Sequence, residues 1–513
     1  MAAVTPTHTT APAVSCAPPP RHARSPRLLA GLMAAVLLGA CGGGGGDSPA
    51  PAPAPAATPA PAPAPAPATP TTRAWQTAER LRATDGPSNG TAGPVVAANA
   101  NGAFIVAWVD ADLGTGDRSL LTRRYTPGAG WGTTDVVASW TSADRPSFHG
   151  MSVGLAPNGT AAIVFIGRSN LRDSLYGSHQ TAGGAWAAPT LLEDDDVGSS
   201  FSRVALVMDN NGVATAVWGQ DFDVFPAVFN TRRALAARMA ANGTWGPYVD
   251  IDFPAGSGIN GIGLTPRLAV NANGDVVAGW TTNIVAGPTA GQYAAATVFT
   301  QGGGWATPAL LTTPVSGYNS VLEDVAIASD GSAAAAMHRT SPVVGENRSV
   351  LLARRAAGGA WGSAVEVDQT GAESLFSRVA LANDGTAVVI WQQASAGGNL
   401  LYTNTVAAGG TVGTAGMLSA STGSIISGAM MQRDSTGNIV LVWGAYEPSY
   451  RLVSRVRDTA GNWGTQSGVW SLASNIGFDS DAALAVSADG SAAAAWHVLD
   501  GVGGAVPWVN VYR

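Results

Sequence analysis

Residues 377–391 read SRVALANDGTAVVIW and hold the pattern that decides the fold. An apolar run, a short polar turn ending in Gly385 and a second apolar run ending in Trp391 follow one another without a break. An Asp-Gly pair between two apolar runs is a strong signal of a β-hairpin, because such a turn requires positive φ. The stretch therefore predicts two antiparallel strands joined by a tight turn.

The same pattern occurs eight times along the chain of 513 residues. In each copy a large side chain follows the turn glycine after six residues, and successive glycines lie 52 to 62 residues apart. A period of this length indicates one supersecondary unit repeated along the chain. The eight pairs are Gly102/Trp108, Gly159/Phe165, Gly212/Trp218, Gly274/Trp280, Gly331/Met337, Gly385/Trp391, Gly437/Trp443 and Gly490/Trp496.

Each repeat continues with two more predicted strands. In the fifth repeat a third apolar run at 350–355 precedes a glycine-rich turn, Trp361 and a short run at 364–367. Six repeats have Trp at this second position, and the sixth repeat has Val412. Four antiparallel strands in about 55 residues make one propeller blade. We predict an all-β protein, an eight-bladed β-propeller of four-stranded antiparallel blades.

The two ends of the repeat region complement each other. The last repeat stops 23 residues after Gly490 and lacks its second Trp and fourth strand, whereas residues 74–81 carry that piece, with Trp75 in frame. We predict that this N-terminal strand closes the last blade, since closure removes exposed sheet edges. The alternative, a run of β-sandwiches, does not explain the complementarity. With Trp75, 13 of the 16 tryptophans fall in the repeat frame, and we predict that they belong to the core.

The first 72 residues differ in composition from the rest. Three arginines precede a 13-residue apolar run at 28–40, which is too short to span a bilayer and is typical of an export signal. Residues 38–41, Leu-Gly-Ala-Cys, resemble the lipobox of bacterial lipoproteins. The resemblance implies lipidation of Cys41 and, with Gly42 rather than Asp after it, the outer membrane of a Gram-negative bacterium. The alternative is an ordinary signal peptide with a chance cysteine.

These observations divide the chain into a signal peptide (1–40), a lipidated cysteine with a Gly- and Pro/Ala-rich tether (41–72) and the propeller (73–513). Alternating Pro and Ala favour an extended spacer. Without the signal, 24 arginines face 34 acidic residues and no basic stripe appears, so we expect no nucleic-acid partner. The expected partners are the membrane, through the lipid, and an envelope protein or glycan. We expect a monomer.

The candidate ligand-binding residues lie at the start of the first strand of each repeat, which in a propeller lines the channel mouth. Arginine side chains match the geometry of carboxylate and phosphate groups. Arg203, Arg267 and Arg378, with Asp324, therefore form a candidate site for an acidic ligand. The alternative is that each arginine pairs with a local acid or repeats by duplication, because residues 201–206 recur verbatim as 376–381. The aligned positions are Val95, Ser152, Arg203, Arg267, Asp324, Arg378, Met430 and Ala483.

The sequence predicts no catalytic residue, no metal site and no cofactor. It contains no nucleophile elbow, phosphate loop, dinucleotide fingerprint or zinc-type histidine pair. The acidic run 193–196 offers oxygen ligands for calcium, but it lacks the spacing of a known calcium loop, and a solvated acidic run is the alternative. His338 and His497 share one repeat position and are expected at strand ends.

The repeat resembles one found in exported bacterial proteins of unassigned function, over residues 73–513. Sialidase propellers are similar in architecture, but their Asp-box has Trp three residues after Gly. The quinoprotein-type repeat is similar to Asp434 through Trp443, although Trp comes too late here. We expect a membrane-tethered, non-enzymatic binding or scaffold propeller at the cell envelope. The alternatives are a glycan-binding lectin and a sialidase- or lyase-like enzyme acting on acidic glycans.

Overall fold

The computed structural model describes most of the second of two compact units, Pro70–Arg513. Within this described part all regular elements are β-strands, and none is a helix able to span a membrane. The predicted signal peptide and tether lie outside it. The described residues are 73–82, 93–112, 114–143, 150–169, 172–193, 203–222, 231–262, 265–343, 346–369, 371–396, 398–419, 424–425, 428–446, 449–471, 482–499 and 505–513.

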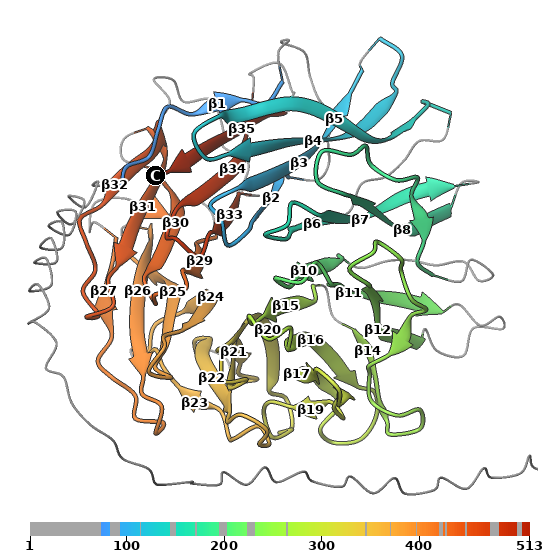
Figure 1. Cartoon of the computed structure of the whole chain (residues 1–513). Helices are drawn as coiled ribbons and strands as arrows, with labels where there is room; N and C mark the ends of the chain where they lie inside the picture. Colours follow the sequence, from blue (N-terminus) through green and yellow to red (C-terminus); the bar gives the residue numbers. More distant parts are fainter. Residues whose placement is uncertain are drawn as a thin grey trace, which may run out of the picture. The chain divides into compact units, whose positions relative to one another are not determined.

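The strands form eight antiparallel sheets, which follow one another around a ring (Figure 1). The first strand of each sheet contacts the first strand of the next, and β33 (Ala483–Val486) in the last sheet contacts β2 (Val95–Ala98) in the first, so the cycle is closed. The predicted eight-bladed propeller is confirmed. In blades 4 and 7 the first strand is split into two pieces that pair with the same second strand, and in blade 4 the fourth strand is split too, into two pieces that both pair with the third strand.

The first four blades, from the inner strand outward, have the following bounds. Blade 1 is β2 (Val95–Ala98), β3 (Phe104–Ala111), β4 (Arg118–Thr126) and β5 (Gly130–Trp140). Blade 2 is β6 (Met151–Leu155), β7 (Ala161–Ser169), β8 (Arg172–Gln180) and β9 (Thr190–Leu191). Blade 3 is β10 (Ala205–Met208), β11 (Ala214–Phe222), β12 (Thr231–Met239) and β13 (Val249–Asp250). Blade 4 is β14 (Ile259–Ile262), β15 (Arg267–Val270), β16 (Val276–Ile284), β17 (Gly291–Thr300), β18 (Gly304–Trp305) and β19 (Ala309–Leu310).

The other four blades continue the same order. Blade 5 is β20 (Asn319–Ile327), β21 (Ala333–Thr340), β22 (Ser349–Arg355) and β23 (Val365–Glu366). Blade 6 is β24 (Ser374–Leu381), β25 (Ala387–Ser395), β26 (Gly398–Val406) and β27 (Gly416–Met417). Blade 7 is β28 (Ser424–Ile425), β29 (Met430–Arg433), β30 (Ile439–Tyr446), β31 (Tyr450–Arg457) and β32 (Ser467–Ser471). Blade 8 is β33 (Ala483–Val486), β34 (Ala492–Leu499), β35 (Ala505–Tyr512) and β1 (Glu79–Arg80).

The last blade is completed by the N-terminal strand, as the sequence predicts. β1 pairs antiparallel with β35, and the two strands lie side by side in Figure 1. Ala74 and Arg513 exchange two backbone hydrogen bonds at 2.9 and 3.2 Å, and Leu81 N donates to Pro507 O at 3.0 Å. The Trp75 indole packs on the ring of Tyr512, with ring centres 5.4 Å apart. The two ends of the propeller chain therefore share one sheet.

The repeated large side chains form the core of the blades. All six first-position tryptophans are at most 1% exposed, as are Phe165 and Met337 in the two remaining blades. The second position has one role throughout: in all eight blades it pairs with the end of the third strand. Val412 and Trp75 take part in this pattern too. The prediction that the tryptophans belong to the core is confirmed for the six at the first position. The seven at the second position, Trp361 among them, are only partly buried and pack against the edges of the core.

The hairpin turns also join neighbouring blades. Asn99, three residues before Gly102, accepts hydrogen bonds from the amides of residues 101 and 103 through Oδ1 at 2.9 and 3.1 Å. Its Nδ2 donates across to Ala156 O in blade 2 at 3.1 Å. Ser487 holds the same position in blade 8 and donates to Asn99 O at 2.7 Å. Blade 8 is therefore joined to blade 1 in the same way as blade 1 to blade 2. In both cases a side chain three residues before the turn glycine donates to a backbone oxygen of the next blade.

Buried acids stand where some fourth strands leave the sheet. Asp252 Oδ2 accepts from Ala234 N at 3.3 Å, and Asp368 Oδ2 accepts from Val350 N at 3.2 Å. Each carboxylate thereby accepts a hydrogen bond from a backbone N–H of the third strand that the fourth strand no longer pairs with. Burial raises the pKa of Asp252 to about 6 and also raises the pKa of Asp368.

Candidate functional site

The strand pairing tests the alignment of the predicted site positions. Seven of the eight pair with the residue just before the first large side chain of the second strand, so they share one place in their blades. Arg267, Asp324 and Arg378 belong to this set, through Gly279, Ala336 and Ile390. These three come from the adjacent blades 4, 5 and 6.

The alignment is wrong for Arg203. Ala205, not Arg203, pairs with Val217, the residue before Trp218. Arg203 lies two residues earlier, before β10 begins, and is exposed. A shift of two residues keeps a side chain on the same face of a strand. Arg203 accordingly still lies close enough to Arg267 for its charge to lower the pKa of Arg267.

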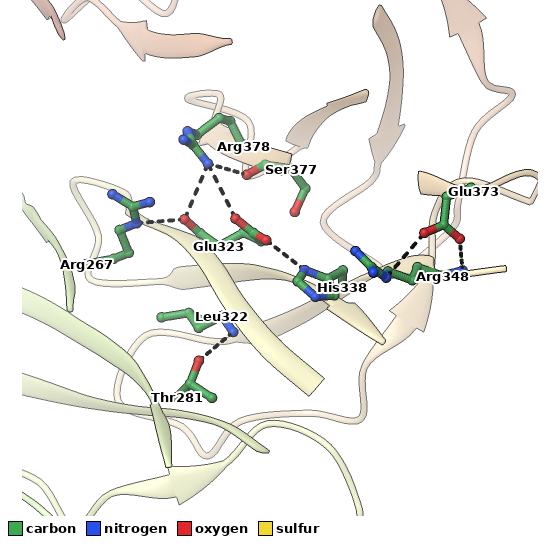
Figure 2. A network of polar contacts seen from close by, with 9 residues as sticks. All are labelled: Arg267, Thr281, Leu322, Glu323, His338, Arg348, Glu373, Ser377 and Arg378. Atoms are coloured by element: carbon green, nitrogen blue, oxygen red, sulfur yellow. Dashed lines mark hydrogen bonds and ion pairs between the residues drawn. The ribbon is translucent and has the colours of Figure 1, made fainter. Parts of the chain in front are cut away.

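Arg267 and Arg378 converge on a bulge in the first strand of blade 5. The pairing of β20 with β21 shifts between Leu322 and Asp324, which leaves Glu323 as the extra residue. Arg267 Nε donates to the Glu323 carbonyl oxygen at 2.8 Å, and Arg378 Nη1 reaches the same oxygen at 3.5 Å (Figure 2). Bulges are common beside functional sites, because they redirect side chains and free backbone groups.

The acidic side chains at the bulge balance part of this positive charge. Arg378 Nη1 lies 3.8 Å from Glu323 Oε2 and donates to Ser377 O at 2.9 Å. Asp324 Oδ2 accepts from Val379 N at 3.1 Å. The local pairing that the sequence left as an alternative is therefore present for Arg378. In Figure 2 no drawn contact uses the two terminal nitrogens of Arg267.

The pKa values show how strongly the cluster is enclosed. Burial lowers the pKa of Arg267 to about 10, the like charge of Arg378 acts in the same direction, and Asp324 opposes them. Burial raises the pKa of Asp324 above its ordinary value, against the attraction of Arg378 and Arg267. At neutral pH Arg267 still carries its charge. The Glu323 bulge thus brings Arg378 close to Arg267, whose surroundings are desolvated, and charge–charge interactions are strong in such surroundings.

A histidine completes the network. His338 Nδ1 lies 2.7 Å from Glu323 Oε1 (Figure 2). His338 belongs to β21, Ala333–Thr340, two residues before its end, and His497 is buried within β34. The sequence analysis missed Glu323 and gave His338 no role. The adjacent acids at 323 and 324 were a usable signal, but the bulge that turns both toward the arginines appears only in the strand pairing.

Phe376 is a second residue that the sequence analysis missed. It lies in the bulge between Leu375 and Arg378, has a φ of 54° and is 47% exposed. A bulky residue at positive φ is strained, and such strain collects at functional sites. Its place in the string that recurs at 201–206 was the one available signal. Residues 201 and 202 lie outside the described part.

No group of three or more potential metal ligands occurs among the described residues. Glu193, the first residue of the acidic run, is 5% exposed. Residues 194–196, the remainder of the run, lie outside the described part. The calcium hypothesis therefore stays untested.

Comparisons with known proteins find distant likenesses among solved structures. No family model matches the chain, and no curated protein matches it. Polysaccharide lyase Uly1 is 10% identical with a TM-score of 0.46, covering 82% of this chain and 90% of that one. A protein of unknown function from Dyadobacter fermentans is 11% identical with a TM-score of 0.41, covering 72% and 95%. The β-propeller domain of the Trilobed protease from Pyrococcus furiosus is 8% identical with a TM-score of 0.41, covering 75% and 96%.

The closed ring of eight sheets defines the class of protein, a β-propeller. Likenesses this remote carry no inference about activity. What the chain does has to be argued from its own residues.

Proposed function

We propose that this protein is a binding propeller that takes an anionic ligand at the mouth of its channel. The observation that supports this is the meeting of Arg267 and Arg378 on one carbonyl oxygen of the Glu323 bulge. Planar guanidinium groups bind carboxylate, sulfate and phosphate groups through paired hydrogen bonds. Arg203 adds a third, exposed cation nearby, and the exposed ring of Phe376 offers an apolar surface beside them.

The expected result for the Arg267→Ala/Arg378→Ala variant is a loss of anion binding of at least about 30-fold, since removing charged hydrogen bonds costs on the order of 2 kcal/mol or more. Calorimetry of native protein with oligogalacturonate, sialyllactose and a heparin-derived oligosaccharide supplies the reference. Arg348→Ala is the matched control, because Arg348 pairs with Glu373 at 3.2 Å and has no drawn contact with Arg267, Glu323 or Arg378 (Figure 2). Equal binding by native protein and the double variant, or no binding of any anionic probe, contradicts the proposal.

A lyase acting on acidic glycans is the second candidate, and one observation favours it. His338 and Glu323 form a 2.7 Å pair beside the two arginines. In a β-elimination a base removes the proton next to a carboxylate, and a cation neutralises that carboxylate. If native protein forms an unsaturated product from an acidic glycan and the His338→Ala variant does not, the protein is a lyase. Binding without turnover favours the non-enzymatic function.

We also propose that the propeller is held at the cell envelope by lipid on Cys41, a residue outside the described part of the chain. The support is the order of charged segment, apolar run and cysteine in the sequence. We expect native protein expressed in a Gram-negative host to fractionate with membranes and to incorporate labelled palmitate. Cys41→Ser should lose the label and leave the membrane fraction. Membrane association that survives this substitution would exclude the lipid anchor.

A further inference from the structure

A second concavity lies between blades 4 and 5, away from the residues assigned to the mouth. Its volume is about 860 Å³, which is the size of typical small-molecule sites. Its walls are the connection from β19 to β20, the end of β21 and the outer strands of blade 5. We propose that this cavity is a binding site for a neutral oligosaccharide.

Aromatic rings supply part of the wall. Tyr318 and Trp361 line the cavity, and both are only partly buried. Tyr293 is 1% exposed, and its hydroxyl donates to Thr289 O at 2.9 Å and Val315 O at 3.2 Å. That hydroxyl fixes the connection on which Tyr318 stands. The rings of Tyr318 and Trp361 thus offer preorganised apolar surfaces of the kind that the carbon–hydrogen faces of a sugar ring cover.

The polar groups of the wall are planar and held in place. Asn319 Oδ1 accepts from Gln292 N at 2.7 Å, which orients the amide. Arg339 lies over the Tyr318 ring, 5.7 Å from its centre, and pairs with Glu366 at 3.2 Å. The side chains of Arg339 and Glu366 are 41% and 44% exposed, so the pair stays accessible to a ligand. Planar amide, carboxylate and guanidinium groups can each hydrogen-bond two neighbouring hydroxyls at once.

The charge of the wall selects against an anionic ligand. Arg339 is already paired with Glu366, and Glu346 adds a further negative charge. No surplus cation remains among the described lining residues. A ligand rich in hydroxyl groups, without charge and with apolar faces, matches this surface, and that combination defines a neutral saccharide.

The cavity and the mouth are separate sites. His338 and Arg339 are consecutive in β21, so their side chains leave opposite faces of the sheet. His338 contacts Glu323 at the mouth, whereas Arg339 contacts Tyr318 and Glu366 in the cavity. The two sites therefore use side chains on opposite faces of β21, and each can be removed without the other.

Calorimetry of the full-length protein with maltohexaose, cellohexaose and mannohexaose tests the proposal. We expect at least one to bind at a single site, with a loss of tenfold or more in Tyr318→Ala and in Arg339→Met. Tyr318→Phe keeps the ring and should retain binding. Tyr446→Ala, which removes a 39%-exposed tyrosine from blade 7, is the matched control and should bind as native protein does.

The Arg267→Ala/Arg378→Ala variant should bind the neutral probe normally, which separates this site from the mouth. Three outcomes would overturn the inference: no neutral probe binds, Tyr318→Ala binds as native protein does, or Tyr318→Ala weakens an anionic oligosaccharide or a peptide instead. A melting temperature measured for each variant distinguishes loss of the site from loss of the fold.

Discussion

Removing residues 73–81 is expected to lower the stability of the propeller by at least about 5 kcal/mol and to shift its melting temperature markedly downward. These residues complete blade 8: Ala74, Gln76 and Leu81 make backbone hydrogen bonds to β35. Trp75 Nε1 also donates to Ser454 Oγ in blade 7 at 2.7 Å, and Leu81 is 6% exposed. Each hydrogen bond contributes about 1 kcal/mol, and loss of a packed Trp costs about 3–5 kcal/mol.

The control for this deletion is a protein that begins at Arg73, which keeps the whole strand and should melt as full-length protein does. A synthetic peptide of residues 73–82 added to the shortened protein should restore part of the lost stability, since binding to the folded state stabilises it. An unchanged melting temperature after removal of 73–81 would show that the ring does not depend on the shared blade.

The stability of Asp252→Asn relative to native protein is expected to rise by about 2 kcal/mol between pH 4 and pH 7. This rise adds to a loss that does not depend on pH, because the asparagine Nδ2 cannot accept the hydrogen bond from Ala234 N. Burial raises the pKa of Asp252 from 3.8 to about 6, so the folded protein holds a proton that the unfolded chain has already released between these values. Stability from this group is fully present below pH 4 and falls as the pH rises through 6. A shift of about two units corresponds to roughly 3 kcal/mol at most.

Denaturant unfolding of native and variant protein at several pH values measures this difference directly. Asparagine keeps an oxygen for the amide of Phe253, which donates to Asp252 Oδ1 at 2.8 Å. Asp384→Asn is the matched control, because Asp384 is an exposed acid in the hairpin turn of blade 6 and does not act on the pKa of Asp252. A stability difference that does not change between pH 4 and 7 would argue against a proton bound to Asp252.

The fold was readable from the sequence because its signals are local and repeated. Turn glycines and large side chains recur at constant separation. Trp75 fits the second tryptophan position of the last repeat, which indicates that the N-terminal segment supplies the fourth strand of blade 8. Each of these residues acts within one blade or between two adjacent ones, as Asn99 does through its bonds to residues 101, 103 and 156. Contacts of this range repeat in every blade, so the residues that make them recur in the sequence with the period of the blade.

The candidate site was readable only in part. Arg267, Asp324 and Arg378 follow the period and were found. Arg203 was misplaced because an identical string of six residues was taken as identical register, although two more residues separate that string from its glycine. The Glu323 bulge and the positive φ of Phe376 depend on how two strands pair, which no residue pattern of one strand contains. The cavity between blades 4 and 5 is shaped by non-repeating connections, so it has no periodic signal.

The shared sheet of blade 8 sets the order in which this chain can finish folding. β1 comes first and its partner β35 comes last in the chain order of the described strands. A link between residues more than 400 positions apart carries a high closure entropy and forms late. Until then the nascent ring exposes unpaired strand edges at both ends, the surfaces most prone to pair with other chains. The pairing of β1 with β35 is therefore the step that removes these edges.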